Sequence, residues 1–202
     1  MTAEAPAAPR PDRPGAIVLA RHGEPALSRK VRLSAQQYRD FWALYEVGGI
    51  LTGQAPPQGL IAAVGSARTL VTSTRLRSIE SAQLLAPGRE FDRHEVLIEA
   101  PLPPPRWPGW IRLSPRIWGF LARFWWWFFN HHEGLETRAQ AEVRAAAAAD
   151  LLSGMVEQGQ DVVVLAHGFF NFMIGRELRR RGWKQTVTEG YKYWSTRRFE
   201  RV

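Results

Sequence analysis

Two short apolar runs, residues 16–20 and 162–166, dominate the hydrophobic pattern of the chain. The first ends abruptly in Arg21-His22-Gly23, and the second ends in His167-Gly168. Short runs of continuous apolar character are typical of strands that are buried on both faces of a parallel sheet. Because ligands bind beyond the carboxyl ends of such strands, this pattern predicts that both histidines face one site.

Helical periodicity fills most of the chain between and after these strands. Apolar residues recur at helical spacing in residues 35–45, 56–64, 78–85, 136–155 and 169–178. Residues 68–72 are predicted to form another core strand, and residues 190–202, rich in Tyr, Trp, Thr and Arg, an antiparallel strand at the sheet edge. The order predicts an α/β fold, a three-layer α/β/α sandwich around a mainly parallel sheet.

Length and composition indicate one domain. The 202 residues suffice for a sizeable core, and the lack of cysteine excludes a disulfide framework. Residues 1–14 are rich in Ala, Pro and Arg, which predicts a disordered tail ahead of a domain over residues 15–202. The tail has no apolar segment of the kind found in secretory signals, so we expect a cytoplasmic protein.

The basic balance of the chain favours anionic partners. Its formal net charge is +8, but the arginines are scattered along the sequence. No zinc-ligand spacing, glycine-rich RNA-binding signature or basic region with heptads is present, so nucleic acid is not expected as a partner. The adjacent His131 and His132 lack the spacing of metal ligands and predict no metal site.

Residues 101–130 form an insert rich in proline and aromatic residues. From Ile117 to Phe129 the only charged residue is Arg123, yet the stretch is shorter than the about 20 apolar residues that span a bilayer. Three interpretations stay open for residues 107–129. In the first, the segment is a helix that packs against the sheet and forms a wall of the pocket. In the second, it is a surface for homo-oligomer formation or a lid over a hydrophobic substrate. In the third, it is a site of peripheral membrane contact.

The motifs along the chain resemble the histidine phosphatase superfamily, also called the phosphoglycerate mutase-like family. Arg21-His22-Gly23 matches the Arg-His-Gly motif of that family, and Ser73–Ala82 is similar to its segment after the second strand, in a register that selects Arg77 over Arg75. Gly134–Thr137, followed by Arg144, is similar to its Gly-Glu-Ser stretch and helix arginine. The matches cover most of residues 16–180.

The resemblance implies a role for each residue of the motifs. His22 would be the nucleophile that becomes phosphorylated, and Arg21, Arg77 and His167 would hold the phosphate. Phosphoryl transfer spreads negative charge over three equatorial oxygens, and arginine matches a phosphate with a planar fork of donors. No cofactor and no metal is expected, because these cations supply the positive charge.

The proton for the leaving oxygen has two candidate donors. Glu99 follows the apolar run at residues 96–98, where the family usually carries its acidic residue. Glu24 adjoins the nucleophile and is the alternative acid or a substrate contact. A positioned general acid typically contributes about 10²- to 10⁴-fold to the rate.

The sequence therefore predicts a phosphomonoester hydrolase that acts on a small phosphorylated substrate through a phosphohistidine. The chain lacks the asparagine and the Phe-Thr-Gly-Trp stretch that follow the motif in phosphoglycerate mutases, which favours hydrolysis over mutase activity. A mutase-type phosphotransferase and a non-catalytic protein that binds a phosphorylated ligand are the alternatives. Residues 24–56 and 100–135 are expected to select the leaving group, with Arg29, Lys30 and Arg32 as candidate contacts to an anionic substrate.

Overall fold

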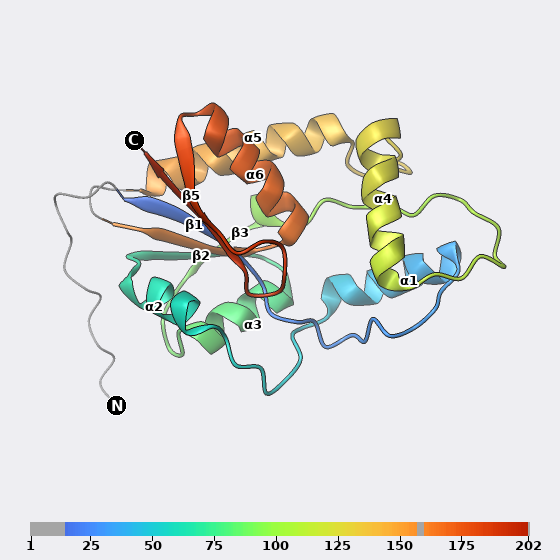
Figure 1. Ribbon diagram of the computed structural model, residues 1–202, viewed down its shortest axis with the longest axis horizontal. Coiled ribbons are helices and arrows are strands. Elements are labelled where there is room, and N and C mark those ends of the chain that lie inside the picture. The colour runs from blue at the N-terminus through green and yellow to red at the C-terminus, as the bar shows by residue number, and fades with distance from the viewer. Residues whose placement is uncertain (1–14, 157–159, 202) are drawn as a thin grey trace.

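A six-stranded sheet forms the centre of the computed structural model, which describes residues 15–156 and 160–201 (Figure 1). The predicted tail over residues 1–14 lies outside the described residues. The strands are β1 (Ala16–Arg21), β2 (Thr69–Ser73), β3 (Asp92–His94), β4 (Val162–Ala166), β5 (Trp183–Thr188) and β6 (Thr196–Arg201), in the spatial order β3-β2-β4-β1-β6-β5. Four neighbours, β3, β2, β4 and β1, are parallel, whereas β6 is antiparallel to β1 and to β5. The predicted α/β fold with a mainly parallel sheet is confirmed.

Helices cover both faces of the sheet. One face carries α2 (Gln58–Ser66) and α3 (Leu76–Leu85), and the other carries α5 (Arg138–Met155) and α6 (Gly168–Arg180) (Figure 1). Successive strand side chains point to opposite faces, so Ile17 and Leu19 pack with α5 and α6 while Val18 packs with α2 and α3. This alternation explains why β4 is apolar at every position and β1 is apolar up to Ala20.

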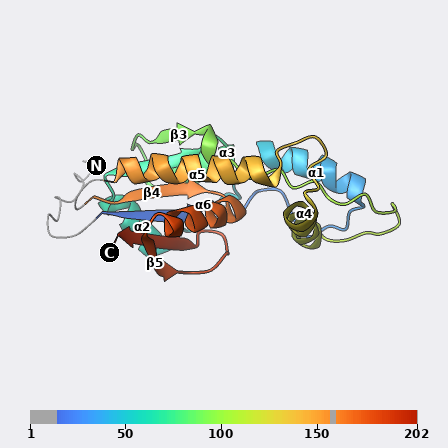
Figure 2. The same cartoon turned by 90° about the horizontal axis from the view of Figure 1, so that it is seen from above.

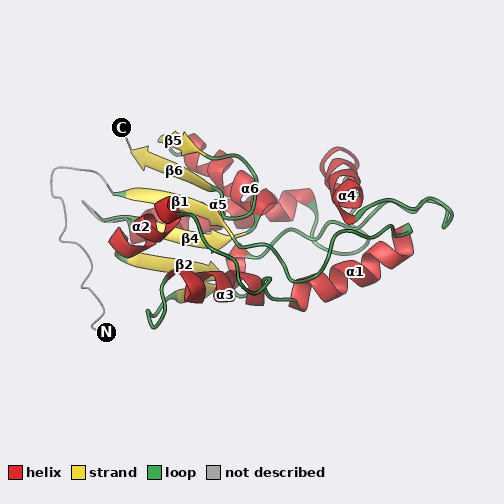
Figure 3. Cartoon of the chain, turned by 60° about the horizontal axis from the view of Figure 1, so that its bottom comes forward, coloured by secondary structure: helices red, strands yellow, loops and turns green. Residues whose placement is uncertain are grey.

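Two more helices lie beyond the carboxyl ends of the parallel strands, where ligands bind in such sheets (Figures 2 and 3). These are α1 (Ala35–Val47), which Ser34 begins with a capping box, and α4 (Pro115–Phe129), which is capped by Ser114 and has proline at its first position. Tyr38 of α1 packs against Trp118 of α4 in a small cluster of their own. The two helices can therefore form walls around a site at the strand ends.

The aromatic insert has a buried face and an exposed face. Trp118, Ala122 and Trp126 of α4 are fully buried, and Trp126 contacts Phe169 of α6. The opposite face is exposed, with Phe120 at 67% and Phe128 at 66% of full accessibility. Within residues 15–156 and 160–201, no helix combines the length and the apolar character needed to cross a membrane.

Two strands were not expected from the sequence pattern. In β3 all three residues are polar, and the chain continues into a 3₁₀ turn, η1 (Glu95–Leu97), instead of a longer strand. In β5, the edge of the sheet, only Trp183 is buried, so no run of apolar residues marks the strand. The segment predicted as one strand over residues 190–202 is a loop followed by β6, which lies between β1 and β5.

Candidate active site

His22 lies just past the end of β1 and is buried in the protein. Its backbone N–H donates to the carbonyl oxygen of Ala166 at the end of β4, at 3.0 Å, which joins the two strand ends. Its ring Nδ1 lies 2.7 Å from the carbonyl oxygen of Gly23. Because a carbonyl oxygen can only accept, Nδ1 carries the hydrogen, and Nε2 keeps the lone pair that a nucleophile needs.

The surroundings of His22 keep its ring neutral. Burial lowers its pKa well below 6.5, and the positive charges of Arg77 and Arg21 lower it further, while the hydrogen bond to Gly23 opposes these effects. Near pH 7 the unprotonated Nε2 is therefore the dominant form.

His167 lies close to His22, as expected from the two strand ends. The ring centroids are 5.2 Å apart, and Nε2 of His167 lies 2.8 Å from the hydroxyl oxygen of Ser73 at the end of β2. Burial, followed by the charge of Arg77, lowers the pKa of His167 well below 6.5. Its Nδ1 is buried and has no hydrogen-bond partner among the described residues, so this nitrogen is available to a ligand.

Arg77, in the first turn of α3, is fully buried and is oriented by the end of α1. Its Nη1 donates to the carbonyl oxygen of Tyr45 at 2.9 Å, and its Nη2 donates to Oε1 of Glu46 at 2.9 Å. Carbonyl groups in the last turn of a helix lack partners within the helix, so this arginine satisfies one of them and meets the negative end of the helix dipole. The other oxygen of Glu46 pairs with Arg75 at 2.8 Å.

Glu46 was not among the residues expected in the site. Its carboxylate neutralises Arg75 and Arg77. These arginines lie about thirty residues after Glu46 in the chain, so the pairs form only once the end of α1 meets the start of α3. No local motif marks such a pairing. The only available signal was a glutamate in the last turn of the predicted helix, where a carboxylate is unfavourable unless a cation meets it.

Arg21 is held by the loop between β5 and β6. Its Nη1 donates to the carbonyl oxygen of Tyr191 at 2.6 Å, and its guanidinium carbon lies 4.2 Å from the centroid of the Tyr193 ring. The Tyr193 ring is also 5.9 Å from the His22 ring. Trp194 in the same loop takes a left-handed backbone with φ of 64° and packs on Gly23. The sequence does not mark this loop as part of the site, and its only signal is the cluster of aromatic residues after Gly190.

The two candidate acids lie in different surroundings. Oε1 of Glu99 accepts the backbone N–H of Phe170 at 2.9 Å, and Oε2 has a longer contact of 3.4 Å with the N–H of Phe169. Both amides belong to the first turn of α6, directly after His167, where the helix dipole favours a carboxylate. Glu24 is exposed, and its carboxylate has no partner among residues 15–156 and 160–201.

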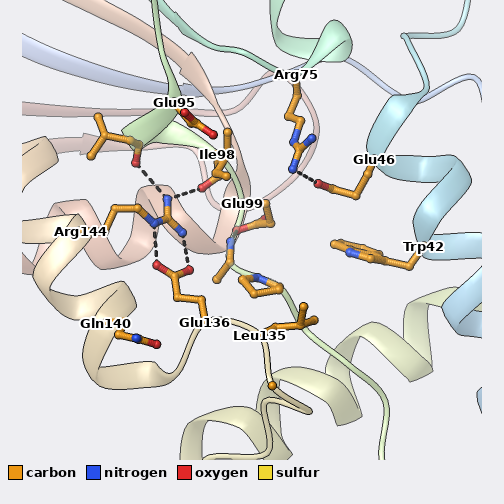
Figure 4. Close-up of a pocket in the computed structure, with 14 residues that line it drawn as sticks. Trp42, Glu46, Arg75, Glu95, Ile98, Glu99, Leu135, Glu136, Gln140 and Arg144 are labelled. Atoms are coloured by element: carbon orange, nitrogen blue, oxygen red, sulfur yellow. Dashed lines mark hydrogen bonds and ion pairs between the residues drawn. The ribbon is translucent and has the colours of Figure 1, made fainter.

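Glu99 lines a cavity of about 960 Å³ together with Glu46 and Arg75 (Figure 4). The chain that carries Glu99 is fixed by Arg144 of α5, which donates to the carbonyl oxygens of Val96 at 2.9 Å and Ile98 at 2.7 Å. Arg144 also forms a bidentate pair with Glu136, with both distances 2.7 Å (Figure 4). The Gly134–Thr137 stretch thus positions the segment that leads to Glu99.

The basic residues after the Arg-His-Gly motif differ in where their side chains lie. Arg29 turns toward the site and donates to the Tyr193 hydroxyl at 2.8 Å, whereas Lys30 and Arg32 are exposed. In the part of the chain that is described, no cluster of three or more His, Cys, Asp or Glu residues is arranged to hold a metal ion. His131 and His132 belong to no such cluster.

The site and the fold define a class of protein. The family profile of the histidine phosphatase superfamily (branch 1) matches residues 17–188. The chain therefore belongs to the histidine phosphatase superfamily.

Solved structures with the same fold come from several bacteria and a protozoan. YhfR of Bacillus stearothermophilus is 19% identical with a TM-score of 0.53, over 82% of this chain and 80% of that one. A phosphoglycerate mutase from Bacillus anthracis str. Sterne is 16% identical with a TM-score of 0.53, over 92% and 88%. A phosphoserine phosphatase variant from Entamoeba histolytica, in complex with phosphoserine, is 16% identical with a TM-score of 0.51, over 82% and 80%. These similarities establish the fold alone, and no curated protein matches the sequence significantly.

Proposed function

We propose that this protein hydrolyses phosphomonoesters through a phosphohistidine on His22. One observation carries the proposal. The ring of His22 is buried with Nδ1 tied to the carbonyl oxygen of Gly23, so its unprotonated Nε2 is available in a site that holds Arg21, Arg77 and a second histidine. Membership of the superfamily supports this assignment.

In the proposed mechanism the phosphoryl group binds between Arg21, Arg77 and His167. Nε2 of His22 attacks phosphorus in line with the ester oxygen, a P–N bond forms, and the P–O ester bond breaks. The guanidinium groups stabilise the charge on the equatorial oxygens, which is the main task in phosphoryl transfer. No metal is required in this scheme, so EDTA should leave the rate unchanged.

Glu99 is the proposed proton donor to the departing alcohol oxygen. Its Oε2 is less tightly held than Oε1, since its contact with the peptide N–H of Phe169 is 3.4 Å. In the proposed mechanism this oxygen delivers the proton when the ester bond breaks. In the second step the Glu99 carboxylate accepts a proton from water that attacks the phosphohistidine, the P–N bond breaks, and inorganic phosphate leaves.

The experiment that tests the function measures phosphate release from p-nitrophenyl phosphate, sugar phosphates, nucleotides and phospholipid headgroup analogues. The wild type should release phosphate with or without EDTA, His22→Ala should release none, and Glu99→Gln should be slowed by about 10²-fold or more. Glu24→Gln is the matched control, and it should keep most of the activity if Glu99 is the acid. The reverse ranking of the two glutamine variants would transfer the acid role to Glu24.

Two outcomes would favour the alternative functions. Transfer of the phosphate to a second hydroxyl instead of to water would indicate a mutase-type phosphotransferase. Absence of turnover on every substrate, with phosphate binding that still requires Arg21 and Arg77, would indicate a protein that binds a phosphorylated ligand without catalysis.

The exposed aromatic face of α4 supports a second proposal, peripheral contact with an anionic membrane. The helix contains no acidic residue, and Arg116 is exposed one helical turn from Phe120. Aromatic side chains next to arginine suit the headgroup region of an anionic bilayer. Sedimentation with phosphatidylglycerol vesicles should capture the wild type and lose a Phe120→Ser/Phe128→Ser double variant. Failure to sediment, together with a dimer mass in light scattering, would assign this face to self-association instead.

A further inference from the structure

A second cavity, with a volume of about 450 Å³, is lined by Arg21 and by Gly168, which directly follows His167. Its basic lining comes from three parts of the chain: β1, the loop that precedes α1, and α4. The lining residues are Arg21, Arg29, Arg116, Arg123, Gly168, Phe169, Phe172 and Tyr191. Four of these are arginines and none is acidic, so the cavity is strongly positive.

The arginines of this cavity lack carboxylate partners within the described part of the chain. The contacts of Arg21 and Arg29 are with the Tyr191 carbonyl and the Tyr193 hydroxyl, and Arg123 donates to the carbonyl oxygen of Gly119 at 2.9 Å. Several arginines elsewhere in the protein are paired with acids, as in Arg39–Glu133, Arg144–Glu136 and Arg181–Asp150. Uncompensated guanidinium groups that converge on a cavity attract an anion.

Buried donors without partners strengthen this interpretation. Nε of Arg21, Nε of Arg29 and the hydroxyl of Tyr38 are buried and make no hydrogen bond with the described residues, and Tyr38 is only 1% exposed. Burial raises the pKa of Tyr38 to about 12, so its hydroxyl keeps the hydrogen that it can donate. Buried donors without an acceptor destabilise the folded protein, and a bound acceptor would remove that cost.

The Tyr38 hydroxyl lies next to Gly119 of α4, together with the guanidinium groups of Arg123 and Arg29. A Cβ atom at this position would lie 3.2 Å from Nη1 of Arg123, 3.3 Å from the Tyr38 hydroxyl and 3.9 Å from Nη2 of Arg29. Glycine therefore lets α4 approach the three groups closely, and the groups surround one small volume. All of them offer hydrogens, which suits a carboxylate or a phosphate.

We propose that this cavity is a second anion subsite, so that the substrate is a phosphomonoester whose alcohol carries another anionic group. The proposal rests on the hydrolase function proposed above. The phosphoryl group would lie between Arg77 and the histidines, and the second anion between Arg29 and Arg123, with Arg21 shared by the two. The rings of Phe169, Phe172 and Tyr191 line the cavity and would contact an apolar or planar linking part of the substrate.

The test compares substrates that differ only in the second charge. We would measure kcat/KM for 4-carboxyphenyl phosphate against its uncharged carboxamide, and for a series of alkanediol bisphosphates against their monophosphates. The wild type should prefer the doubly anionic member of a pair by tenfold or more. Arg123→Gln and Arg29→Gln should each reduce that preference about tenfold, the effect expected of one charge-assisted hydrogen bond.

Two control variants separate a specific contact from a general effect. Arg123→Lys keeps the charge and should retain most of the preference, which also tests whether substitution at this position permits folding. Arg112→Gln removes the same charge from an exposed position outside the cavity and should leave the preference unchanged. An equal loss in Arg112→Gln and Arg123→Gln would overturn the proposal, because it would reflect net charge alone.

A binding measurement keeps failure of the subsite distinct from failure of the hydrolase function. Calorimetry with His22→Ala would compare phosphonoacetate and short bisphosphonates with methylphosphonate. Binding of the doubly anionic compounds that is tenfold tighter and depends on Arg123 supports the subsite even if no ester is hydrolysed. Hydrolysis without any preference in the paired substrates, or equal binding of all the phosphonates, would overturn the subsite and leave the proposed function intact.

Discussion

At the scale of single residues, Gly23 shows how closely the site is packed. A Cβ atom at this position would lie 2.4 Å from Cζ2 of Trp194, a distance that the ring cannot accept without moving. The Trp194 backbone N–H also donates toward the carbonyl oxygens of Arg21 and His22, at 3.2 and 3.4 Å. The ring of Trp194 therefore fixes the backbone at His22, the proposed nucleophile.

We predict that Gly23→Ala lowers the free energy of unfolding by about 1–3 kcal/mol, the usual cost of overpacking, and slows phosphate release as well. Urea denaturation and the phosphate-release assay would measure the two effects. Gly59→Ala is the control, because a Cβ there meets nothing within 4 Å and alanine favours the helix that contains it. Equal stability of the two variants would show that Trp194 moves freely.

Sequence alone could predict the residues that follow apolar strands, and it could not predict those placed by long-range packing. His22 and His167 each follow a continuous apolar run, and the geometry of parallel strands then brings their ends together. Glu46 and Tyr193 reach the same site from a helix end and from a loop near the end of the described chain. Nothing in their local sequence records these neighbours.

At the scale of elements, α5 supports the site from a distance. Arg144 links three parts of the structure: the Glu136 carboxylate, the carbonyl groups of Val96 and Ile98, and the ring of Phe170 in α6, whose centroid lies 3.8 Å away. Arg144 therefore fixes the position of the segment that ends in Glu99. This role agrees with the position of Arg144 in the motif that resembles the family.

We predict that Glu136→Gln lowers the free energy of unfolding by about 2–3 kcal/mol, because it leaves the partly buried guanidinium of Arg144 without its counter-charge. The control is Glu142→Gln, which removes an i,i+4 partner of Arg138 whose side chain is 36% exposed, and it should change stability by less than about 1 kcal/mol. Chemical denaturation of both variants checks the difference. A loss of the same size in both would mean that the Arg144 network adds no more than an ordinary surface pair.

The elements that the sequence pattern could not predict are those with the least buried surface. The helices and core strands bury one face or both, so their periodicity is strong, and their observed bounds lie close to the expected ones. In β3 and β5 the pairing comes from backbone hydrogen bonds to a neighbouring strand. Polar side chains are common on such edge strands because they discourage pairing with other chains. Pairing of this kind leaves little hydrophobic signal.

At the scale of the whole molecule, the two buried histidines link the chemistry to the stability of the fold. The pKa values of His22 and His167 lie well below 6.5 in the folded protein, whereas an unfolded chain has histidines near 6.5. Below about pH 7 the unfolded state therefore binds protons that the folded state does not. The free energy of unfolding must therefore fall as pH decreases, and it is fully retained only above the pKa that the histidines have in the unfolded chain.

We predict that the free energy of unfolding decreases between pH 7 and pH 5, with each of the two histidines contributing a slope of up to about 1.4 kcal/mol per pH unit. Urea denaturation across this range would show a shallower slope for His22→Gln and for His167→Gln than for the wild type. His132→Gln replaces a histidine outside the pair and should keep the wild-type slope. Identical slopes in all four proteins would contradict the neutral state assigned to the buried rings.

The pairing of β6 with β1 also sets the order in which the protein can be completed during synthesis. Ala16 is opposite Glu200 and Ala20 is opposite Thr196, so the strand that precedes His22 receives its second neighbour from residues far downstream in the chain. A nascent chain that already contains β2 and β4 still has an open edge along β1, which is free to pair with other chains. The edge of β1 therefore stays open until β6 has been translated, and the sheet beside His22 closes only then.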